Sequence, residues 1–205
     1  MRETENLQAQ VAGSIRESIA VKERLLNDAE VVSTIARVSE VMIQALERGN
    51  KVILFGNGGS AADAQHIAAE FVGRFAFDRP ALPALALSVN TSCVTAIGND
   101  YGFELVFSRQ IEALGRSGDV AVGISTSGNS ANVVRGLSAA RKMGLGTVAL
   151  AGCTGGKMKD QADYCICVPA KETPRIQECH ILIGHVISQL VEQIIFHEQS
   201  CVSGS

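Results

Sequence analysis

The sequence predicts an α/β fold with a parallel sheet, and three observations support this. From residue 51 onward, short apolar runs alternate with segments of helical periodicity. Glycine and proline separate these segments, and two of the apolar runs end in loops rich in glycine and serine. Strands that alternate with helices form parallel sheets covered on both faces. We therefore expect a three-layer αβα sandwich around a five-stranded parallel sheet, preceded by an N-terminal helical hairpin.

Five strands and five helices are expected in the α/β part. The strands are 51–55, 84–88, 119–124, 146–150 and 163–168. The helices are 60–72, 91–98, 103–114, 130–143 and 174–197. Ligands of such sheets bind beyond the carboxyl ends of the strands, so the loops that follow the strands are expected to form the site.

The residues that precede the sheet have a different pattern. Residues 4–26 and 30–48 show apolar positions at helical spacing, and Asp28 between them can cap the second helix. We expect a helical hairpin over 1–50, whose apolar stripe packs on the sheet domain or on another subunit. The α/β domain then spans 51–198, and a flexible tail spans 199–205.

Composition excludes several classes of protein. A chain of 205 residues with 46% apolar content suits one α/β domain with a helical extension. The net charge of −3 and the lack of a basic run argue against a nucleic-acid partner. There is no run of 18 apolar residues, so no membrane span is expected. The six cysteines fit no zinc-finger spacing; we expect reduced, mostly buried thiols and a cytoplasmic compartment.

Two loops carry the donors of an anion site. Residues 56–60 follow the first predicted strand, and residues 125–130 follow the third. Backbone N–H groups and hydroxyls at a helix N-terminus bind phosphate well. The second loop contains no Lys or Arg, so hydrogen bonds and the helix dipole would hold a phosphate there.

Two other interpretations of these loops remain open. The pattern Gly56-x-Gly58-x-x-Ala61 satisfies a relaxed dinucleotide-binding motif. That motif also requires an acidic residue at the end of the second strand, and the segment through Asn90 has none. Alternatively, both loops are only tight turns. Two such loops at similar positions, with five hydroxyls between them, favour a binding site.

His66 and Glu70 lie four residues apart on the helix predicted over 60–72. This spacing puts both side chains on one face of the helix. By itself such a pair is often a solvated pair, or a core histidine with its partner. The helix begins at the first loop, however, and its other residues are mostly small or apolar, which favours a functional role.

The last predicted helix carries Gln177, His180 and His185 within an apolar sequence. We expect His180 to be structural. Gln177 and His185 differ by eight positions, which is about 80° around a helix and ~12 Å along it. One metal ion could not easily take both from one regular helix. Either the first turn is irregular, or the two residues belong to different copies of the site.

These segments together resemble the sugar isomerase (SIS) domain family, and within it the enzymes of seven-carbon sugar phosphates. The resemblance covers nearly the whole chain. It is carried by residues 56–60 with Asp63, His66 and Glu70, by residues 95–100, by residues 125–130, and by residues 175–178 with His185. It implies a flavodoxin-like fold, a homotetramer with active sites between subunits, and one zinc ion per subunit.

The resemblance also implies a reaction. Sedoheptulose 7-phosphate would be converted to D-glycero-D-manno-heptose 7-phosphate through an enediol. This is the first step of ADP- or GDP-heptose biosynthesis, which serves lipopolysaccharide core, capsule or S-layer glycans.

Residue roles follow from the same resemblance. The implied metal ligands are His66, Glu70, Gln177 and His185. The implied substrate-binding residues are Asn57, Gly58, Gly59, Glu70, Asn99, Asp100, Ser125, Thr126, Ser127, Ser130 and Gln177. Glu70 and His185 are the implied acid–base pair. Pro174 stands where some members have an acid before Arg175, which leaves the role of Glu172 open.

The chemistry agrees with these roles. An aldose–ketose isomerisation needs a base near carbon, for which Glu70 is suited, and an acid near oxygen, for which His185 is suited. Histidine and carboxylate ligands suit zinc, whereas an amide ligand is less common. The alternatives are a non-catalytic SIS protein that binds a replication initiator or senses a phosphosugar, and an aminosugar etherase. Intact Glu70 and His185 favour the isomerase, and the short chain without a second SIS module disfavours the etherase.

Overall fold

A parallel five-stranded sheet forms the centre of the molecule, as predicted. The computed structural model describes residues 2–202, and the side chains of residues 6–196. The strand order is β2-β1-β3-β4-β5. The strands are β1 (Val52–Gly56), β2 (Ala84–Ala86), β3 (Val120–Ser125), β4 (Gly146–Ala151) and β5 (Tyr164–Cys167). All neighbouring strands are parallel, so the loops after β1 and β3 leave the same edge of the sheet side by side.

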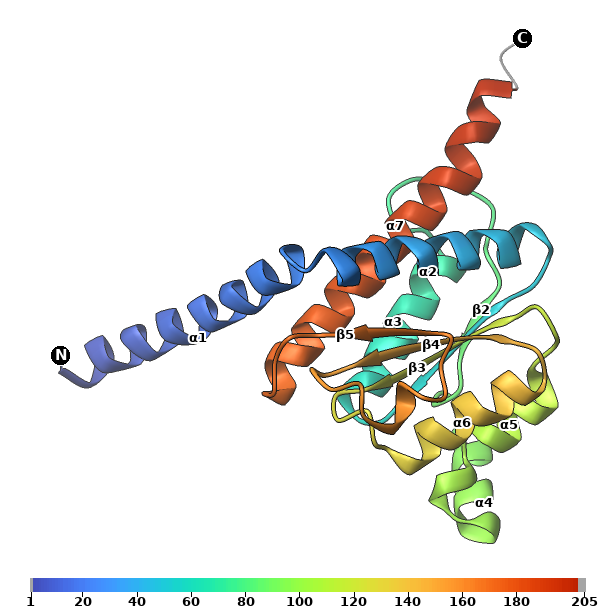
Figure 1. Ribbon diagram of the computed structural model, residues 1–205, viewed down its shortest axis with the longest axis horizontal. Coiled ribbons are helices and arrows are strands. Elements are labelled where there is room, and N and C mark those ends of the chain that lie inside the picture. Colours follow the sequence, from blue (N-terminus) through green and yellow to red (C-terminus); the bar gives the residue numbers. More distant parts are fainter. Residues whose placement is uncertain (1, 203–205) are drawn as a thin grey trace.

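Helices cover both faces of this sheet, which gives the predicted three layers (Figure 1). One layer contains α2 (Ala29–Glu47), α3 (Gly59–Val72) and α7 (Thr173–Val202). The other contains α4 (Thr91–Tyr101), α5 (Ser108–Leu114) and α6 (Ala131–Lys142). Each layer has its own apolar core against the sheet. In the second core the rings of Phe55 and Phe107 lie with centroids 5.3 Å apart.

The helix predicted over 103–114 is interrupted. A 3-10 turn covers Phe103–Leu105, and α5 begins only at Ser108. Val106 and Phe107 lie between them, and both are buried in the core next to α6. Val106 and Phe107 are apolar because they belong to the core, although they lie outside a regular helix. The apolar pattern in the sequence therefore ran across the break and predicted one continuous helix.

The two N-terminal helices form where expected, but they do not fold back on each other as a hairpin. The Asp28 carboxylate accepts hydrogen bonds from the N–H groups of Glu30 and Val31 and so caps α2. Figure 1 shows α1 (Arg2–Leu26) and α2 end to end, with α1 reaching beyond the sheet. The chain continues in one direction because α2 packs on α7 and β5, whereas only the last turns of α1 are buried. The predicted hairpin geometry is therefore wrong.

Most of α1 presents an apolar stripe that the described part of this chain does not cover. Its members are spaced four residues apart, so they share one face, and each is more than half exposed: Leu7, Val11, Ile15 and Ile19. Side chains of this kind are normally buried when four of them line one helix face. The stripe is consistent with a contact to another subunit.

The last helix is longer than predicted. The helix α7 extends through Val202, so most of the predicted tail 199–205 is helical, and residues 203–205 lie outside the described part. Over Thr173–Phe196 it is long and apolar enough to cross a membrane by length and composition. It packs against α2 and α3, and Cys179 and Val191 on it are completely buried, as in a core helix.

The prediction of mostly buried cysteines is wrong. Of the five cysteines whose side chains are described, all are reduced and only Cys179 is buried. Cys153 is exposed, and Cys93, Cys165 and Cys167 are partly buried. The sixth, Cys201, lies outside the residues whose side chains are described.

Candidate active site

The loop at residues 125–130, called here the serine loop, gathers hydroxyls at the edge of the sheet. Ser125 Oγ lies 2.9 Å from Ser130 Oγ and 3.4 Å from Ser127 Oγ. Ser127 also accepts a hydrogen bond from the N–H of Asn129, which holds the turn closed. Thr126 and Ser127 are at least partly accessible, so a ligand can reach this loop. The structure thus brings together the hydroxyls of Ser125, Ser127 and Ser130, three of the four hydroxyl residues that the sequence singled out.

The two helices that begin beside this loop receive no hydrogen bond from the side chain of their N-cap residue. At the start of α2 the Asp28 carboxylate accepts from the N–H groups of Glu30 and Val31, and at the start of α4 the Asn90 side-chain oxygen accepts from the N–H of Cys93. In contrast, neither Gly58 before α3 nor Ser130 before α6 caps its helix with a side chain. Uncapped N-terminal N–H groups are the donors with which helices bind anions. Two such helix ends at one sheet edge offer donors that suit an anion.

An amide pair connects the two loops. Asn57 Nδ2 donates to Asn132 Oδ1, and Asn132 Nδ2 donates to Asn57 Oδ1, both at 2.9 Å. Asn132 is buried on the first turn of α6. Sequence reasoning selected Asn57 but missed Asn132, since nothing in its spacing connects it to the first loop. The reciprocal bond fixes the start of α6 relative to the loop before α3.

Three titratable side chains meet farther along α3. The Nε2 atoms of His66 and of His185 on α7 are 2.9 Å apart, and His66 Nε2 lies 3.1 Å from Glu70 Oε1. One ligand atom from each of the three lies within 4.8 Å of the other two. The helices α3 and α7 pack side by side, and their register places His185 opposite the face that carries His66 and Glu70. This group is called the histidine cluster below.

Asp63 and Phe75 complete the surroundings of the histidine cluster. Asp63 lies one turn before His66, and its Oδ2 is buried without a hydrogen-bond partner among the described residues. Burial raises the pKa of Asp63, while the nearby charges of His66 and His185 act to lower it. The ring of Phe75 lies 5.8 Å from that of His185 and shields one side of it. A buried carboxylate oxygen without a partner favours positive charge beside it.

The histidine cluster fits a divalent metal ion. Two imidazole nitrogens on a tetrahedral zinc ion lie about 3.3 Å apart, close to the observed separation of 2.9 Å. Imidazole and carboxylate are ligands that zinc takes readily. The unpaired oxygen of Asp63 nearby agrees with a cation at this position. His66, Glu70 and His185 can therefore hold a metal ion without a rearrangement of the fold.

Gln177 does not join this cluster within the chain. Its amide lies over Gly59 at the first residue of α3, where a Cβ atom would come within 2.5 Å of Gln177 Nε2. Since α7 is helical from Thr173, Gln177 and His185 are separated by ~12 Å along its axis. The irregular first turn considered from the sequence is thus absent, and three of the four predicted ligands come together in one chain.

Three other predicted residues also lie apart from the site. Asn99 and Asp100 are exposed at the end of α4, in the layer opposite α3 and α7, and they bond to each other at 2.8 Å (Figure 1). Glu172 is exposed beside Arg24 and Arg175, at a cleft formed with α1. None of the three has a bond to the serine loop or to the histidine cluster within the described part of the chain.

A buried ion pair, which the sequence did not reveal, supports the histidine cluster. Arg79 Nε lies 2.9 Å from Glu192 Oε1, and both side chains are at most 2% exposed. The Arg79 guanidinium also donates to the backbone carbonyls of Glu70 and Phe71, at the end of α3. Glu192 lies two turns beyond His185 on α7. The pair therefore ties the end of the helix that carries Glu70 to the helix that carries His185.

Glu192 also holds the segment that covers His185. Its two carboxylate oxygens accept the N–H groups of Phe75 and Ala76 at 2.9 and 2.6 Å. Burial by itself would raise the pKa of Glu192, but these hydrogen bonds and the Arg79 guanidinium outweigh it and lower that pKa. The carboxylate form is thus the one that the fold stabilises.

His180, which the sequence analysis treated as structural, is completely buried. One ring nitrogen lies 3.2 Å from the carbonyl oxygen of Ala151 at the end of β4, and the other has no partner among the described residues. Burial lowers the pKa of His180 to about 4, although the hydrogen bond to Ala151 opposes this. His180 is therefore neutral at physiological pH and connects α7 to the sheet.

A family model described as the SIS domain matches residues 16–152. The chain belongs to the SIS domain family. The match includes both loops, His66 and Glu70, whereas Gln177 and His185 on α7 lie beyond it.

Relatives that cover nearly the whole chain are named phosphoheptose isomerase. The protein of that name from Aneurinibacillus thermoaerophilus is 56% identical over 189 residues, which are 92% of this chain and 96% of the relative. The one from Aquifex aeolicus is 59% identical over 161 residues, 78% of this chain and 84% of the relative.

Solved structures agree with these relatives. The phosphoheptose isomerase from Neisseria gonorrhoeae superposes with a TM-score of 0.86 at 46% identity, over 91% of this chain and 99% of that one. The phosphoheptose isomerase from Francisella tularensis has a TM-score of 0.86 at 34% identity, over 90% of this chain and 97% of that chain. The SIS fold and its order of elements are therefore those of this group of isomerases.

We predict that Glu192→Gln destabilises the fold by about 3–5 kcal/mol at neutral pH, because it leaves Arg79 buried without a counter-charge. Since the pKa of Glu192 is lowered in the folded state, the carboxylate contributes stability above the ordinary carboxyl pKa. That contribution is lost as the pH falls through the folded-state pKa. Urea unfolding of both proteins should therefore show a difference that shrinks on acidification.

Glu104→Gln is the matched control for this experiment. Glu104 pairs with Arg135 at 3.8 Å on the surface, where both side chains are at least half exposed, so its loss should cost less than about 1 kcal/mol. Equal stability losses in the two variants would contradict the structural role assigned to Glu192.

Proposed function

We propose that this chain is an aldose–ketose isomerase that converts sedoheptulose 7-phosphate to D-glycero-D-manno-heptose 7-phosphate. The observation that carries the proposal is that Glu70, on the helix that begins at the proposed anion site, meets His185 of α7 in one cluster. The names of the close relatives support the same reaction. The product would enter ADP- or GDP-heptose biosynthesis, and the enzyme would be cytoplasmic.

The residues divide into a phosphate end and a proton-transfer end. The hydroxyls of Ser125, Thr126, Ser127 and Ser130, with Asn57 and the N–H groups at Gly58 and Gly59, would hold the phosphate. About 10 Å of helix separates Gly59 from His66. An extended seven-carbon sugar phosphate has a length of that order, so its C1–C2 end can reach the histidine cluster when its phosphate occupies the serine loop.

The isomerisation then needs two proton movements. Glu70 would take the proton from C1, which gives an enediol, and return it to C2. His185 would move a proton between the oxygens on C1 and C2, and could assist ring opening in the same way. The ring of Phe75 limits the access of water to His185, which protects the enediol.

The histidine cluster would hold zinc through His66, Glu70 and His185. When bound, a zinc ion would polarise the substrate carbonyl and keep the two reacting oxygens on one side. Glu70 is both a proposed ligand and the proposed base, so one carboxylate oxygen would hold the ion while the other would accept the carbon-bound proton. The two oxygens of a carboxylate permit both roles.

A non-catalytic SIS protein would not need this arrangement. A phosphosugar sensor requires the serine loop, but it has no use for a carboxylate and an imidazole placed together beyond it. The histidine cluster therefore favours the enzyme over the binding protein.

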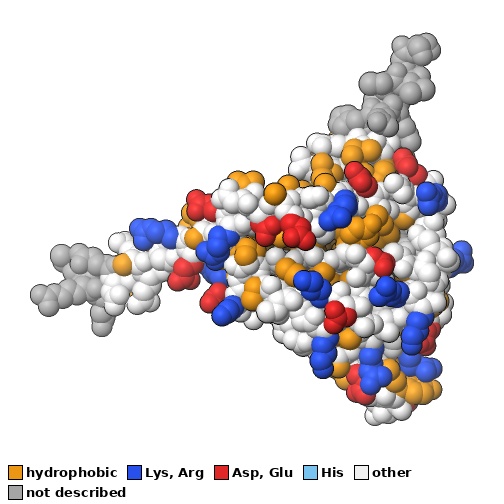
Figure 2. Space-filling model, in the orientation of Figure 1, with side chains coloured by type: hydrophobic (Ala, Val, Ile, Leu, Met, Phe, Trp, Pro, Cys, Tyr) orange, Lys and Arg blue, Asp and Glu red, His pale blue; other side chains and the backbone are white. Residues whose placement is uncertain are grey.

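A homotetramer with shared sites is the second part of the proposal. Gln177, Asn99 and Asp100 lie far from the histidine cluster of their own chain, so as ligands of that site they would come from another copy. The stripe on α1 is uncovered, and Figure 2 shows further hydrophobic side chains along the N-terminal helices and beside α7. Closed symmetry would repeat equivalent interfaces in such an assembly.

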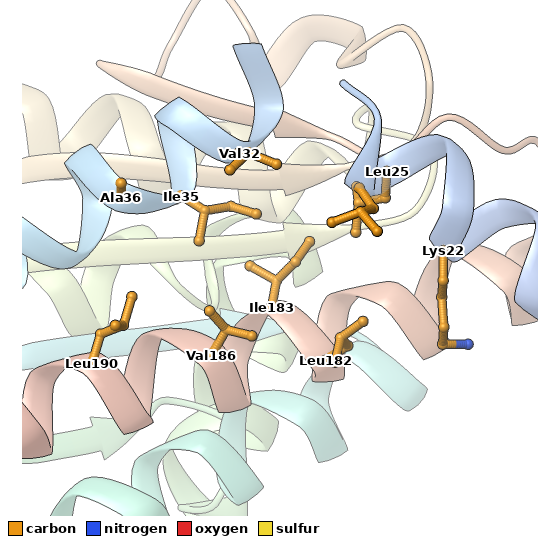
Figure 3. A pocket seen from close by; sticks show the side chains of 10 residues that line it. Lys22, Leu25, Val32, Ile35, Ala36, Leu182, Ile183, Val186 and Leu190 are labelled. Carbon is orange, nitrogen blue, oxygen red and sulfur yellow. The ribbon is translucent and has the colours of Figure 1, made fainter. Parts of the chain in front are cut away.

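An apolar groove between α1, α2 and α7 offers a surface for that assembly. Figure 3 shows its lining, with Val32 and Ile35 above and Leu182, Val186 and Leu190 below. Val32 and Val186 are 46% and 37% exposed, which is high for aliphatic residues that face each other across a groove. Helix faces from a second copy would bury them.

We expect Glu70→Gln to lower kcat by about 10²–10⁴-fold while the fold and the binding of sugar phosphate persist, because an amide cannot take the carbon-bound proton. Turnover of sedoheptulose 7-phosphate and exchange of solvent deuterium into the sugar should both fall. Metal content must be measured alongside, and Glu112→Gln, an exposed carboxylate on α5, is the control. Deuterium exchange at the wild-type rate would assign the base to another residue.

Ser127→Ala should raise the KM for sedoheptulose 7-phosphate by about fivefold with little change in kcat, since it removes one hydrogen bond to the phosphate. Ser117→Ala, at the opposite edge of the sheet, should change neither value. Binding is measured in parallel with unphosphorylated sedoheptulose. Unchanged affinity for the phosphate ester together with weaker binding of the free sugar would exclude the serine loop as the phosphate site.

Mixed assemblies can locate Gln177. When Glu70→Gln and Gln177→Ala chains are unfolded together and reassembled, about one quarter of the sites should combine an intact cluster with an intact Gln177 from another chain. Glu70→Gln mixed with His185→Ala is the control, because both residues belong to one cluster and no activity should return. Mixed tetramers are verified by native mass spectrometry. An inactive first mixture would place Gln177 and the cluster in the same chain.

A further inference from the structure

Cys165 and Cys167 form a pair of thiols outside the site described above. They occupy alternate positions of β5, so both side chains point to the same face of the sheet. Their sulfur atoms are 3.6 Å apart, and both side chains are only partly buried. The strand β5 has four residues and lies at the edge of the sheet, with β4 as its single neighbour.

The surroundings shift the pKa values of the two thiols in opposite directions. The hydrogen bond with Cys165 and the charge of Lys159 lower the pKa of Cys167 to about 7, although burial and the carboxylates of Asp28 and Glu30 oppose this. The same hydrogen bond and burial raise the pKa of Cys165. Of the two thiols, Cys167 is therefore the one whose deprotonated form its surroundings favour. A thiolate beside a second thiol is the arrangement that peroxides oxidise readily.

The thiols contact the loop that supports the serine loop. A Cβ atom at Gly155 would lie 3.2 Å from both sulfur atoms, so the backbone there rests directly on the pair. On its other side, this backbone lies against Gly128 of the serine loop, where a Cβ atom would come within 2.2 Å of the Gly155 carbonyl oxygen. Both glycines have positive φ angles, 73° and 66°.

Hydrogen bonds strengthen this contact between the two loops. Met158 N–H donates to the carbonyl of Gly128 at 3.0 Å, and Lys157 N–H donates to Asn129 Oδ1 at 3.1 Å. Movement of residues 155–158 would therefore change the backbone of the serine loop.

We propose that Cys165 and Cys167 are a dithiol site for hydroperoxides, and that its oxidation to a disulfide weakens phosphate binding at the serine loop. The Cys167 thiolate attacks a peroxide oxygen, breaks the O–O bond and becomes a sulfenic acid, with hydroxide as the leaving group when the oxidant is hydrogen peroxide. The Cys165 sulfur then attacks the sulfenic sulfur, and the S–OH oxygen leaves as water with the Cys165 proton. Two thiols are oxidised and one peroxide is reduced.

Geometry explains why the disulfide reaches the serine loop. A disulfide needs sulfur atoms about 2.05 Å apart and Cβ atoms about 3.8 Å apart, closer than alternate residues of an extended strand allow. The strand β5 must therefore contract, which an edge strand can do more easily than a central one. Gly155 rests on both sulfurs and must shift with them. The link to phosphate rests on the proposed function, whereas the oxidation itself does not.

The experiment uses the full chain with Cys93, Cys153 and Cys201 replaced by Ser, and retains the buried Cys179 as an internal control thiol. After treatment with hydrogen peroxide, we expect the intact mass to fall by two hydrogens and peptide mapping to locate the link between Cys165 and Cys167. Cys165→Ser in this background should stop at a sulfenic acid on Cys167 that dimedone traps. Cys167→Ser should resist oxidation.

Binding of inorganic phosphate is then measured by calorimetry before oxidation, after oxidation and after reduction with dithiothreitol. We expect affinity to fall about fivefold on oxidation, as for the loss of one hydrogen bond, and to return on reduction. Both single-serine variants should keep their affinity after peroxide.

The outcomes separate the two parts of the proposal. Sulfinic acid at Cys167 without a disulfide, or oxidation of Cys179 instead, would overturn the dithiol site. A disulfide that leaves phosphate affinity unchanged would overturn the coupling. If Ser127→Ala leaves phosphate binding of the reduced protein unchanged, the proposed phosphate site fails, while the mass measurement still decides whether the dithiol site exists.

Discussion

The close approach of α3 and α7 determines the geometry of the candidate site. Gly184 allows this approach, because a Cβ atom there would overlap the Ile67 side chain. The positions next to this contact carry His66 and His185, whose imidazoles therefore meet. One residue corresponds to about 100° of rotation, so a shift of either helix by one position would separate the rings. The ion pair of Arg79 and Glu192 fixes the same two helices two turns farther along.

Helix α3 carries two residues of the histidine cluster and also sets the distance from that cluster to the serine loop. It begins at the proposed anion site, where the β1–α3 loop and the serine loop leave the same edge of the sheet. It then carries His66 and Glu70 into the contact with α7. Side chains of a helix lean toward its N-terminus, so the Glu70 carboxylate returns to the level of His66. The distance between the phosphate end and the proton-transfer end is thus set by a rigid element rather than by a loop.

Patterns in short stretches of sequence predicted the features that depend on residues close together in the chain. Apolar runs identified all five strands, and the spacing of His66 and Glu70 identified one face of α3. The Arg79–Glu192 pair could not be predicted, because its residues are 113 positions apart and neither belongs to a periodic pattern. The prediction that α1 folds back on α2 as a hairpin was wrong for a related reason. Its apolar stripe predicts burial without identifying the partner, and this chain does not provide one.

The absence of Lys and Arg from the serine loop makes its rigidity essential. An ammonium or guanidinium attracts phosphate over several ångströms in many orientations, whereas hydrogen bonds weaken steeply when distance or angle departs from the optimum. A phosphate site of hydroxyls and backbone N–H groups therefore needs a fixed backbone. The Asn57–Asn132 amide pair holds it on one side, and the contact of Gly128 with Gly155 holds it on the other. Loss of either support would lower affinity although no residue that touches the phosphate had changed.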